Sequence, residues 1–292
     1  MKLLVTGASG LLGTKLCQLA IARNHEVHAA YYQHSPLYGT PVALNILDPK
    51  AVQKTIDKTK PSVAVHAAAM TDVDKCEIEK ELSWKTNVDA TENLVRLCKK
   101  RGVFLLYVST DYVFDGEKGM YKENDKTAPV NYYGFTKLKA EEAVRNLRDY
   151  CIVRGSVVYG SIPATGKINF ALWLIDKLRK KEVVRIVTDQ WNSPTLNTNM
   201  AEMILEVLEK RKNGTFHLSG ATRLSRYEFA KHIAEAFNLD AKFMTAIKSK
   251  HINWVAKRPK DSSLNVNKAE ETLLCKPLEI GEALEELRKE NA

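Results

Sequence analysis

The sequence has few cysteines and no long apolar run, and both absences narrow what the protein can be. No apolar stretch approaches the roughly 18 residues of a membrane-spanning helix, so we expect no contact with a membrane. The five cysteines are odd in number and scattered, with no Cys-x-x-Cys pair and no zinc-like spacing to the seven histidines. This pattern argues against disulfides and against a bound metal. The apolar start at 1–7 is too short for a signal peptide, which favours a cytoplasmic protein.

Positive charge is in excess but is not concentrated. Lys and Arg number 44 against 35 Asp and Glu, for a formal charge of +9. Only short clusters stand out, at 177–181 and 257–260, so the sequence argues against nucleic-acid binding. A positive surface would also attract a phosphorylated cofactor or a dianionic nucleotide-sugar. A homodimer is compatible with this composition but is not required by it.

Short apolar segments alternate with amphipathic ones through the first half of the chain. Strands are predicted at 2–6, 26–32, 62–67, 103–109 and 151–154, and helices at 11–23, 48–58, 79–100 and from Tyr133 onward. Repeated strand–helix–strand units predict an α/β fold with a doubly wound parallel sheet of the Rossmann type. After about Ser156 the regularity loosens. We therefore predict a dinucleotide-binding domain at 1–156, to which segments within 188–222 return, and a smaller α/β substrate lobe at 157–292.

A glycine-rich turn follows the first predicted strand. Gly7, Gly10 and Gly13 have the spacing Gly-x-x-Gly-x-x-Gly between a strand and a helix. Such a turn lets a pyrophosphate approach the backbone at the helix N-terminus. The second strand ends in residues 31–35 without an acidic side chain to bind a ribose 2′-hydroxyl. This favours NADP(H) over NAD(H), which remains allowed, with His34 or Ser35 near the 2′-phosphate.

Tyr133 and Lys137 are four residues apart on a predicted helix, so they share one face. We expect the ammonium of Lys137 to help lower the pKa of Tyr133. Ser109 and Thr110 end the strand that should lie beside a nicotinamide, where a hydroxyl can polarise a carbonyl oxygen. Asn87 lies on the preceding helix, where such folds position a water or a backbone bond. A bound dinucleotide and a proton-donating tyrosine together are suited to carbonyl reduction.

Longer stretches carry a resemblance to a known family: 67–75, 109–116, 131–141, 189–195 and 258–264. Through them the chain resembles the extended short-chain dehydrogenase/reductase superfamily, and within it the dTDP-4-dehydrorhamnose reductases. The resemblance implies reduction of the 4-keto group of a deoxy-sugar nucleotide bound between two lobes. It implies Thr110, Tyr133 and Lys137 as the catalytic trio.

The motifs and the resemblance together predict the remaining contacts. The predicted cofactor-binding residues are Gly7, Ser9, Gly10, Leu11, Leu12, His34, Asp48, Ala67, Ala68, Ala69, Asn87, Ser109, Tyr133 and Lys137. The predicted substrate-binding residues are Thr71, Asp111, Tyr112, Val113, Trp191 and Arg258. For Trp191 a packing role between the lobes, and for Arg258 an exposed salt bridge, are equally good interpretations. His66, at an apolar strand end, is interpreted as a satisfied core histidine.

Two departures and one alternative leave the substrate open. The family usually has tryptophan where this chain has Val157 and glycine where it has Asn192. The segment Thr110-Asp111-Tyr112 lacks the second carboxylate that a sugar-nucleotide dehydratase needs, which argues against that reaction. A different class also resembles this family: the regulatory β subunit of methionine adenosyltransferase, which binds NADP without a catalytic role.

Overall fold

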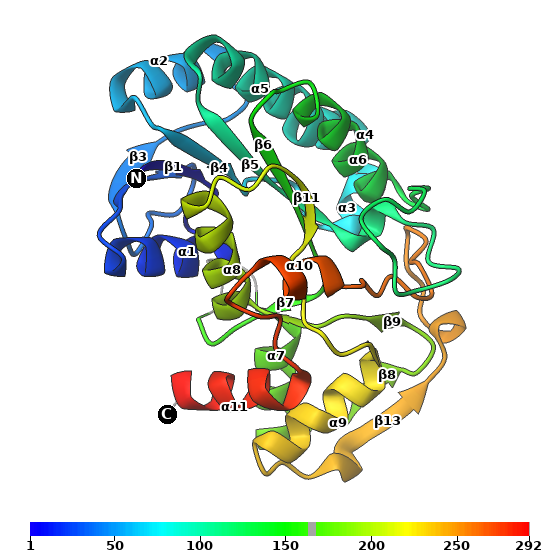
Figure 1. Cartoon of the computed structure of the whole chain (residues 1–292). Coiled ribbons are helices and arrows are strands. Elements are labelled where there is room, and N and C mark those ends of the chain that lie inside the picture. Colours follow the sequence, from blue (N-terminus) through cyan, green and yellow to red (C-terminus); the bar gives the residue numbers. More distant parts are fainter. Residues whose placement is uncertain (163–167, 292) are drawn as a thin grey trace.

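The computed structural model describes residues 1–162 and 168–291, and residues 163–167 and 292 of the predicted substrate lobe lie outside the described residues. Within the described part, one parallel sheet has the strand order β11-β6-β5-β4-β1-β2-β3 (Figure 1). Its strands are β1 (Lys2–Thr6), β2 (Glu26–Tyr31), β3 (Thr40–Ala43), β4 (Val63–His66), β5 (Phe104–Thr110), β6 (Tyr150–Gly155) and β11 (Gly214–His217). The prediction of a doubly wound parallel sheet is confirmed.

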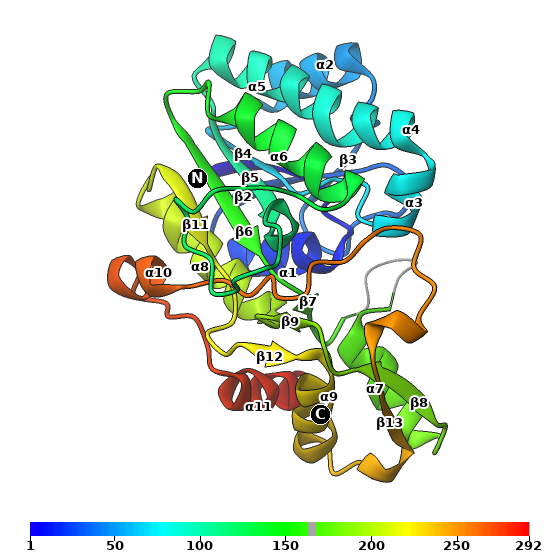
Figure 2. The ribbon, with the colours of Figure 1, turned by 90° about the vertical axis from the view of Figure 1, so that its right-hand side faces the viewer.

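Helices cover both faces of this sheet because its strands are apolar on both sides. Alternate residues of a strand point to opposite faces. Leu3 and Val5 pack against α1 (Leu11–Ala22) and α8 (Asn197–Glu209), while Leu4 faces the opposite layer. That layer consists of α2 (Pro49–Thr59), α5 (Ala90–Arg101) and α6 (Tyr132–Val144), which lie together on one side of the sheet in Figure 2.

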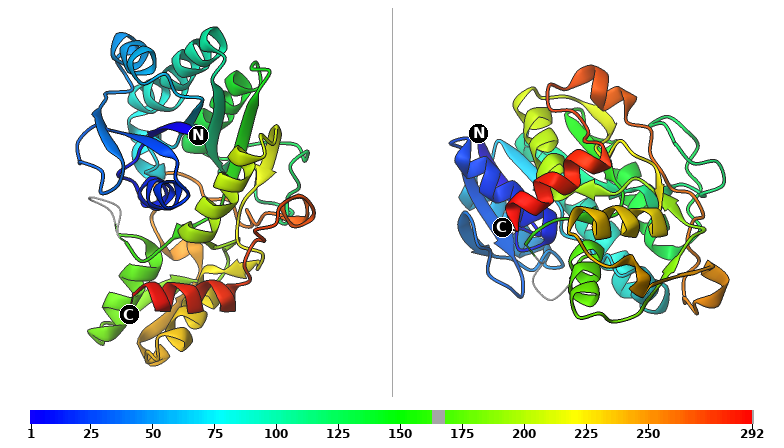
Figure 3. Two further views of the ribbon diagram at one scale, coloured as in Figure 1. Left: turned by 60° about the vertical axis from the view of Figure 1, so that its left-hand side comes forward. Right: turned by 90° about the horizontal axis from the view of Figure 1, so that it is seen from below.

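Most of the elements that follow β6 in the chain form a smaller lobe below the sheet (Figure 1). Its members are β7 (Val158–Tyr159), α7 (Phe170–Arg179), β8 (Val184–Val187), β9 (Trp191–Asn192), β10 (Thr195–Leu196), β12 (Leu224–Ser225), α9 (Arg226–Ala236), β13 (Met244–Ile247) and α11 (Ile280–Glu290). Residues of α7, α9 and α11 share an apolar core separate from those of the sheet. Figure 3 shows α11 in this lobe, remote from α2. The exact domain boundary near residue 156 stays a prediction, although α8 and β11 belong to the sheet layers.

Two segments differ from the sequence-based prediction. Strand β3 was not predicted, because it is short, contains Pro41 and lies at the sheet edge, where proline is tolerated. The single helix predicted at 79–100 is instead α4 (Lys80–Trp84), a π-helical turn at Lys85–Asp89, and α5. A short helix, α3 (Val73–Ile78), precedes them. The π turn carries Asn87, and such turns are frequent at functional sites.

Candidate active site

The glycine turn joins β1 to α1 with almost no space for side chains. A Cβ on Gly13 would lie 2.1 Å from the carbonyl oxygen of Gly7, and one on Gly7 would lie 2.8 Å from the amide nitrogen of Ala68. Gly7 also has a φ of +70°, which favours glycine. Helix α1 begins after Gly10, so the amides of Leu11 and Leu12 have no intrahelical acceptor. This is a backbone cradle suited to a pyrophosphate.

A buried chain of hydrogen bonds fixes the loop that follows β4. The Thr6 hydroxyl bonds His66 Nδ1 at 2.7 Å, and His66 Nε2 bonds the Thr91 hydroxyl at 3.1 Å. Burial lowers the pKa of His66 to about 3, so the ring is neutral at neutral pH. The interpretation of His66 as a satisfied core histidine is confirmed. Asn87 holds the same loop, accepting from Met70 N at 2.8 Å and donating to Met70 O at 3.1 Å.

Thr110 ends β5 and is followed by a 3₁₀ turn, Asp111–Val113. The Asp111 carboxylate is buried and accepts three hydroxyl hydrogen bonds: from Thr110 at 2.9 Å, Ser156 at 2.8 Å and Ser262 at 2.5 Å. Burial raises the pKa of Asp111 in spite of these donors. Its oxygens are therefore occupied by residues from three separate parts of the chain.

Helix α6 reaches this turn because of one glycine. A Cβ on Gly134 would lie 2.1 Å from the carbonyl oxygen of Tyr112. Asn131 caps the helix by accepting from Gly134 N at 2.8 Å. Cap and glycine together bring Tyr133 against the end of β5, where its phenol lies beside Thr110.

The ionisation of Tyr133 differs from the sequence-based expectation. Burial raises the pKa of Tyr133 above its ordinary value, and the neighbouring Thr110 hydroxyl offsets this only in part. The expectation that Lys137 lowers the pKa of Tyr133 is therefore wrong for this state. Desolvation of the phenolate is the largest cause of this shift, and Lys137 is not among its main causes. A phenol that keeps its proton at neutral pH can serve as a proton donor.

Lys137 is only 3% exposed and reaches β5 through its ammonium group. Its Nζ donates to Val108 O at 2.7 Å and lies 4.1 Å from the centre of the Tyr107 ring. Burial lowers the pKa of Lys137 to about 7, although the carboxylate of Glu141 opposes this shift. The lysine is thus positioned on the same helical face as Tyr133 and close to the end of β5.

Glu141 ties the base of α6 to β5 and β6. It accepts from Arg154 through both of its oxygens, at 2.9 and 2.7 Å, and from the Ser109 hydroxyl at 2.6 Å. Both charged side chains are buried. Because the Ser109 hydroxyl is donated to Glu141, the structure directs it into this network, and Thr110 is the hydroxyl next to Tyr133.

The predicted substrate residues have different surroundings. Tyr112 lies edge-on to Tyr133, with ring centroids 5.9 Å apart. Val113 is fully buried in a small core cluster, so its side chain has a packing role. Trp191 stacks under Arg223, and Thr71 is exposed in the loop after β4.

Arg258 is paired across the two lobes. Its guanidinium holds the Asp74 carboxylate through two contacts of 3.0 Å. Asp74 also accepts from Ala256 N at 2.9 Å. Arg258 thus has a carboxylate partner of its own.

The other predicted cofactor residues surround the glycine turn and the loops beside it. Ser9 lies within the turn, Ala67, Ala68 and Ala69 follow β4, and His34 is exposed in the loop between β2 and β3. Asp48 caps α2, accepting from Lys50 N and Ala51 N, as its position before Pro49 predicted. Sequence reasoning missed the roles of Ser156, Ser262 and Gly134. Only Gly134 left a local signal, as the glycine between Tyr133 and Lys137.

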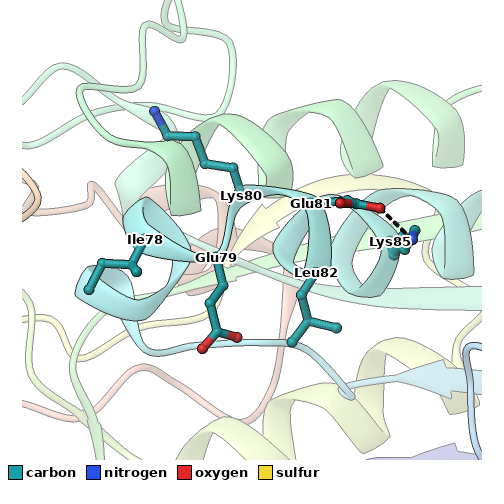
Figure 4. Close-up of a pocket in the computed structure, with 6 residues that line it drawn as sticks. All are labelled: Ile78, Glu79, Lys80, Glu81, Leu82 and Lys85. Atoms are coloured by element: carbon teal, nitrogen blue, oxygen red, sulfur yellow. Dashed lines mark hydrogen bonds and ion pairs between the residues drawn. The ribbon is translucent and has the colours of Figure 1, made fainter.

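A separate surface hollow of about 570 Å³ lies over α3 and α4 (Figure 4). It is lined by Ile78, Glu79, Lys80, Glu81, Leu82 and Lys85, and none of the predicted site residues contributes to it. Among the described residues, no three His, Cys, Asp or Glu side chains gather closely enough to hold a metal ion. No helix within residues 1–162 and 168–291 is long and apolar enough to cross a membrane.

The parallel sheet, the glycine turn and the tyrosine–lysine helix identify one class of protein, the extended short-chain dehydrogenase/reductases. A family model described as the RmlD substrate binding domain matches residues 1–292, and the chain belongs to that family. It is 34% identical over 275 residues to the probable low-salt glycan biosynthesis reductase Agl14 of Haloferax volcanii, covering 93% of this chain and 92% of that protein.

Two further similarities bear on function. The chain is 34% identical over 278 residues to methionine adenosyltransferase 2 subunit beta of Pongo abelii, covering 92% of this chain and 81% of that protein. The crystal structure of dTDP-4-dehydrorhamnose reductase from Bacillus anthracis, in complex with NADP, has a TM-score of 0.89 at 30% identity, and the match covers 99% of this chain and 100% of that one.

Proposed function

We propose that this protein is an NADP(H)-dependent reductase of the 4-keto group of a deoxy-sugar nucleotide, of the dTDP-4-dehydrorhamnose type. The observation that carries the proposal is the placement of Tyr133 beside Thr110, with Lys137 on the same face of α6, at the same sheet edge as the glycine turn. That arrangement suits transfer of a proton to a carbonyl oxygen next to a bound dinucleotide.

Each residue of the trio has a separate role in this proposal. Bound NADPH supplies the hydride that adds to the carbonyl carbon. Thr110 would turn its hydroxyl from Asp111 to the carbonyl oxygen of the substrate and stabilise the negative charge that develops there. Tyr133 gives its phenolic proton to that oxygen, so the O–H bond of the tyrosine breaks as the O–H bond of the alcohol forms. Lys137 binds the nicotinamide ribose and compensates the charge left on Tyr133.

The choice of NADP(H) rests on two supports. The tip of β2 has no acidic residue at 31–35 to bind a free ribose 2′-hydroxyl. The Bacillus anthracis reductase was crystallised with NADP. The pyrophosphate would lie against the amides of Leu11 and Leu12. NAD(H) would be the weaker ligand.

A cytoplasmic location forms part of the proposal, since all five cysteines are free thiols and four of them are buried.

The test is oxidation of NADPH and of NADH with dTDP-4-dehydrorhamnose generated in situ, comparing the wild type with Tyr133→Phe. Loss of the proton donor should lower kcat by about a hundred- to ten-thousandfold while NADPH binding persists. Tyr132→Phe is the matched control, because it removes a phenol from the adjacent position of α6. An undiminished rate in Tyr133→Phe would show that the proton comes from another group.

A regulatory role is the second candidate, supported by the 34% identity to methionine adenosyltransferase 2 subunit beta. In that role the protein would bind NADP and act as a partner subunit. Turnover distinguishes the two candidates: a wild-type protein that binds NADPH but reduces no 4-keto sugar nucleotide would favour the regulatory subunit.

A 4,6-dehydratase reaction is disfavoured, because the only carboxylate following Thr110 in its turn is Asp111, which is held by three hydroxyls.

A further inference from the structure

Two serines from distant parts of the chain, Ser156 and Ser262, meet at one oxygen of Asp111. The Ser156 hydroxyl donates to Asp111 Oδ2 at 2.8 Å, and the Ser262 hydroxyl donates to the same oxygen at 2.5 Å. The Thr110 hydroxyl donates to the other carboxylate oxygen, Oδ1, at 2.9 Å. None of these four residues is more than 6% exposed, so water has little access to the cluster.

Ser262 is held in place by backbone hydrogen bonds to both lobes. Its amide donates to Trp191 O at 3.0 Å, and the amide of Asp261 donates to Gly116 O at 3.0 Å. Trp191 belongs to β9 in the smaller lobe, whereas Gly116 lies in the loop after β5 and its 3₁₀ turn. The Ser262 hydroxyl therefore reaches Asp111 from a segment that is fixed against both lobes.

Ser156 precedes a residue with a strained backbone. Val157 has a φ of +43°, a conformation that is costly for a β-branched residue. Thr195 maintains this turn, because its hydroxyl donates to Ser156 O at 2.7 Å and its amide donates to Val157 O at 3.2 Å. The Ser156 hydroxyl oxygen also accepts from Ser193 N at 3.3 Å. These bonds impose the strained turn from which Ser156 reaches Asp111.

The proposed reaction requires the Thr110 hydroxyl to move. Thr110 can donate to the substrate carbonyl only after its hydroxyl has left Asp111 Oδ1. A buried carboxylate that loses its donors is destabilised, because no other group replaces the lost hydrogen bonds. Within residues 1–162 and 168–291, the two serines are the other side-chain donors to this carboxylate. They keep Oδ2 hydrogen-bonded while Thr110 turns, which lowers the cost of that movement.

We propose that Ser156 and Ser262 are positioning residues of the reductase, which hold the Asp111 carboxylate so that the Thr110 hydroxyl can leave it for the substrate carbonyl. This inference rests on the proposed function, because it assumes that Thr110 assists a carbonyl reduction. Neither serine has to touch the substrate, since each acts on Thr110 through Asp111.

The test is steady-state oxidation of NADPH with dTDP-4-dehydrorhamnose by the wild type, Ser156→Ala and Ser262→Ala, each measured again in a Thr110→Val background. Each alanine variant alone should lower kcat by about ten- to a hundredfold and leave KM and the affinity for NADP+ within about twofold. In the Thr110→Val background no hydroxyl turns. The same substitutions should then leave the residual kcat unchanged, because residues that act through one another are not additive.

Ser263→Ala is the matched control, because it removes a buried hydroxyl from the next position, one that donates to Asp261 Oδ1 at 2.6 Å. It should lower the melting temperature, as Ser262→Ala does, but leave kcat at the wild-type value. Retained NADP+ binding shows that each variant is folded.

Two results would overturn the inference. One is a wild-type kcat in both Ser156→Ala and Ser262→Ala, and the other is a loss of kcat by the same factor with and without Thr110→Val. A wild type that reduces dTDP-4-dehydrorhamnose would keep the proposed function in either case. A wild type that reduces no 4-keto sugar nucleotide would remove both.

Discussion

The burial of Lys137, a proposed catalytic residue, makes the stability of the protein depend on pH. Its ammonium group is buried with one backbone acceptor, Val108 O, and its pKa falls to about 7. From about pH 7 to its ordinary pKa near 10.5, the unfolded chain holds a proton that the folded protein has released. Stability should therefore rise with pH across this window, and the full cost of burying the charge is present below it.

Lys137→Met should consequently stabilise the cofactor-free protein while abolishing turnover. The gain should be on the order of a few kcal/mol below about pH 7 and should shrink as the pH approaches 10. Urea unfolding of both proteins at about pH 6 and about pH 10 measures it. Lys139→Met is the control, because it removes a more exposed lysine, paired with Glu142, from the same helix. A stability difference between wild type and Lys137→Met that does not change with pH would refute the pH linkage.

At the scale of the element, the position of α6 is decided by its contact with the turn after β5. Gly134 meets the Tyr112 carbonyl oxygen so closely that an added methyl would displace the helix. Gly134→Ala should destabilise the protein by about 1–3 kcal/mol and lower kcat, because Tyr133 and Lys137 move with the helix. Gly281→Ala, in α11 with open space around it, should instead stabilise by about 0.5–1 kcal/mol.

Thermal unfolding and NADPH turnover of the two glycine variants form the measurement. A Gly134→Ala protein with wild-type stability and rate would mean that the turn after β5 can move away from the added methyl group without loss of stability. The comparison with Gly281 separates the loss of a close approach from the general effect of alanine in a helix.

Local pattern accounts for most elements of the sheet and for the helices of the smaller lobe, but not for the short strands of that lobe. The apolar strands and the Asp48–Pro49 helix start could be read from sequence, because each depends on its own residues. The two-residue strands β9, β10 and β12 are too short for any periodicity to predict. Val157 has a φ of +43°, rare for a β-branched residue, and its carbonyl is bonded by Thr195 N. Such a conformation follows from tertiary contacts alone.

The residues of the candidate site also fall into two groups, those that local sequence motifs predict and those that only the fold brings in. Thr110, Tyr133 and Lys137 stand in local motifs, and the structure brings them to one place. Ser262 reaches the site from far along the chain, and no spacing in the sequence links it to Asp111. The rise in the pKa of Tyr133 was also beyond sequence reasoning, because it depends on how far the folded chain removes the phenol from water.

For the whole molecule, the relation between the two lobes depends partly on one ion pair. Asp74 on α3 is held by Arg258 and by Ala256 N, both on the segment that returns from the smaller lobe. Although burial opposes it, the hydrogen bonds from Ala256 and Arg258 lower the pKa of Asp74. The stabilisation that comes from ionised Asp74 is present above the pKa of an aspartate in the unfolded chain, about 3.9. It is lost as the pH falls through the lower pKa of Asp74 in the folded protein.

Asp74→Asn should therefore cost on the order of 1 kcal/mol at neutral pH, since the pair is partly exposed, and much less in acid. It should also weaken substrate binding more than NADPH binding, because the tie joins the lobes while the glycine turn lies within the larger one. Two measurements check this prediction. One is the free energy of unfolding at about pH 7 and about pH 3, and the other is the affinity of the variant for the substrate and for NADPH. Asp57→Asn is the control, because it breaks the exposed pair with Arg101 inside the larger lobe. Equal losses of substrate affinity in the two variants would mean that the Asp74–Arg258 pair does not control how the lobes meet around the substrate.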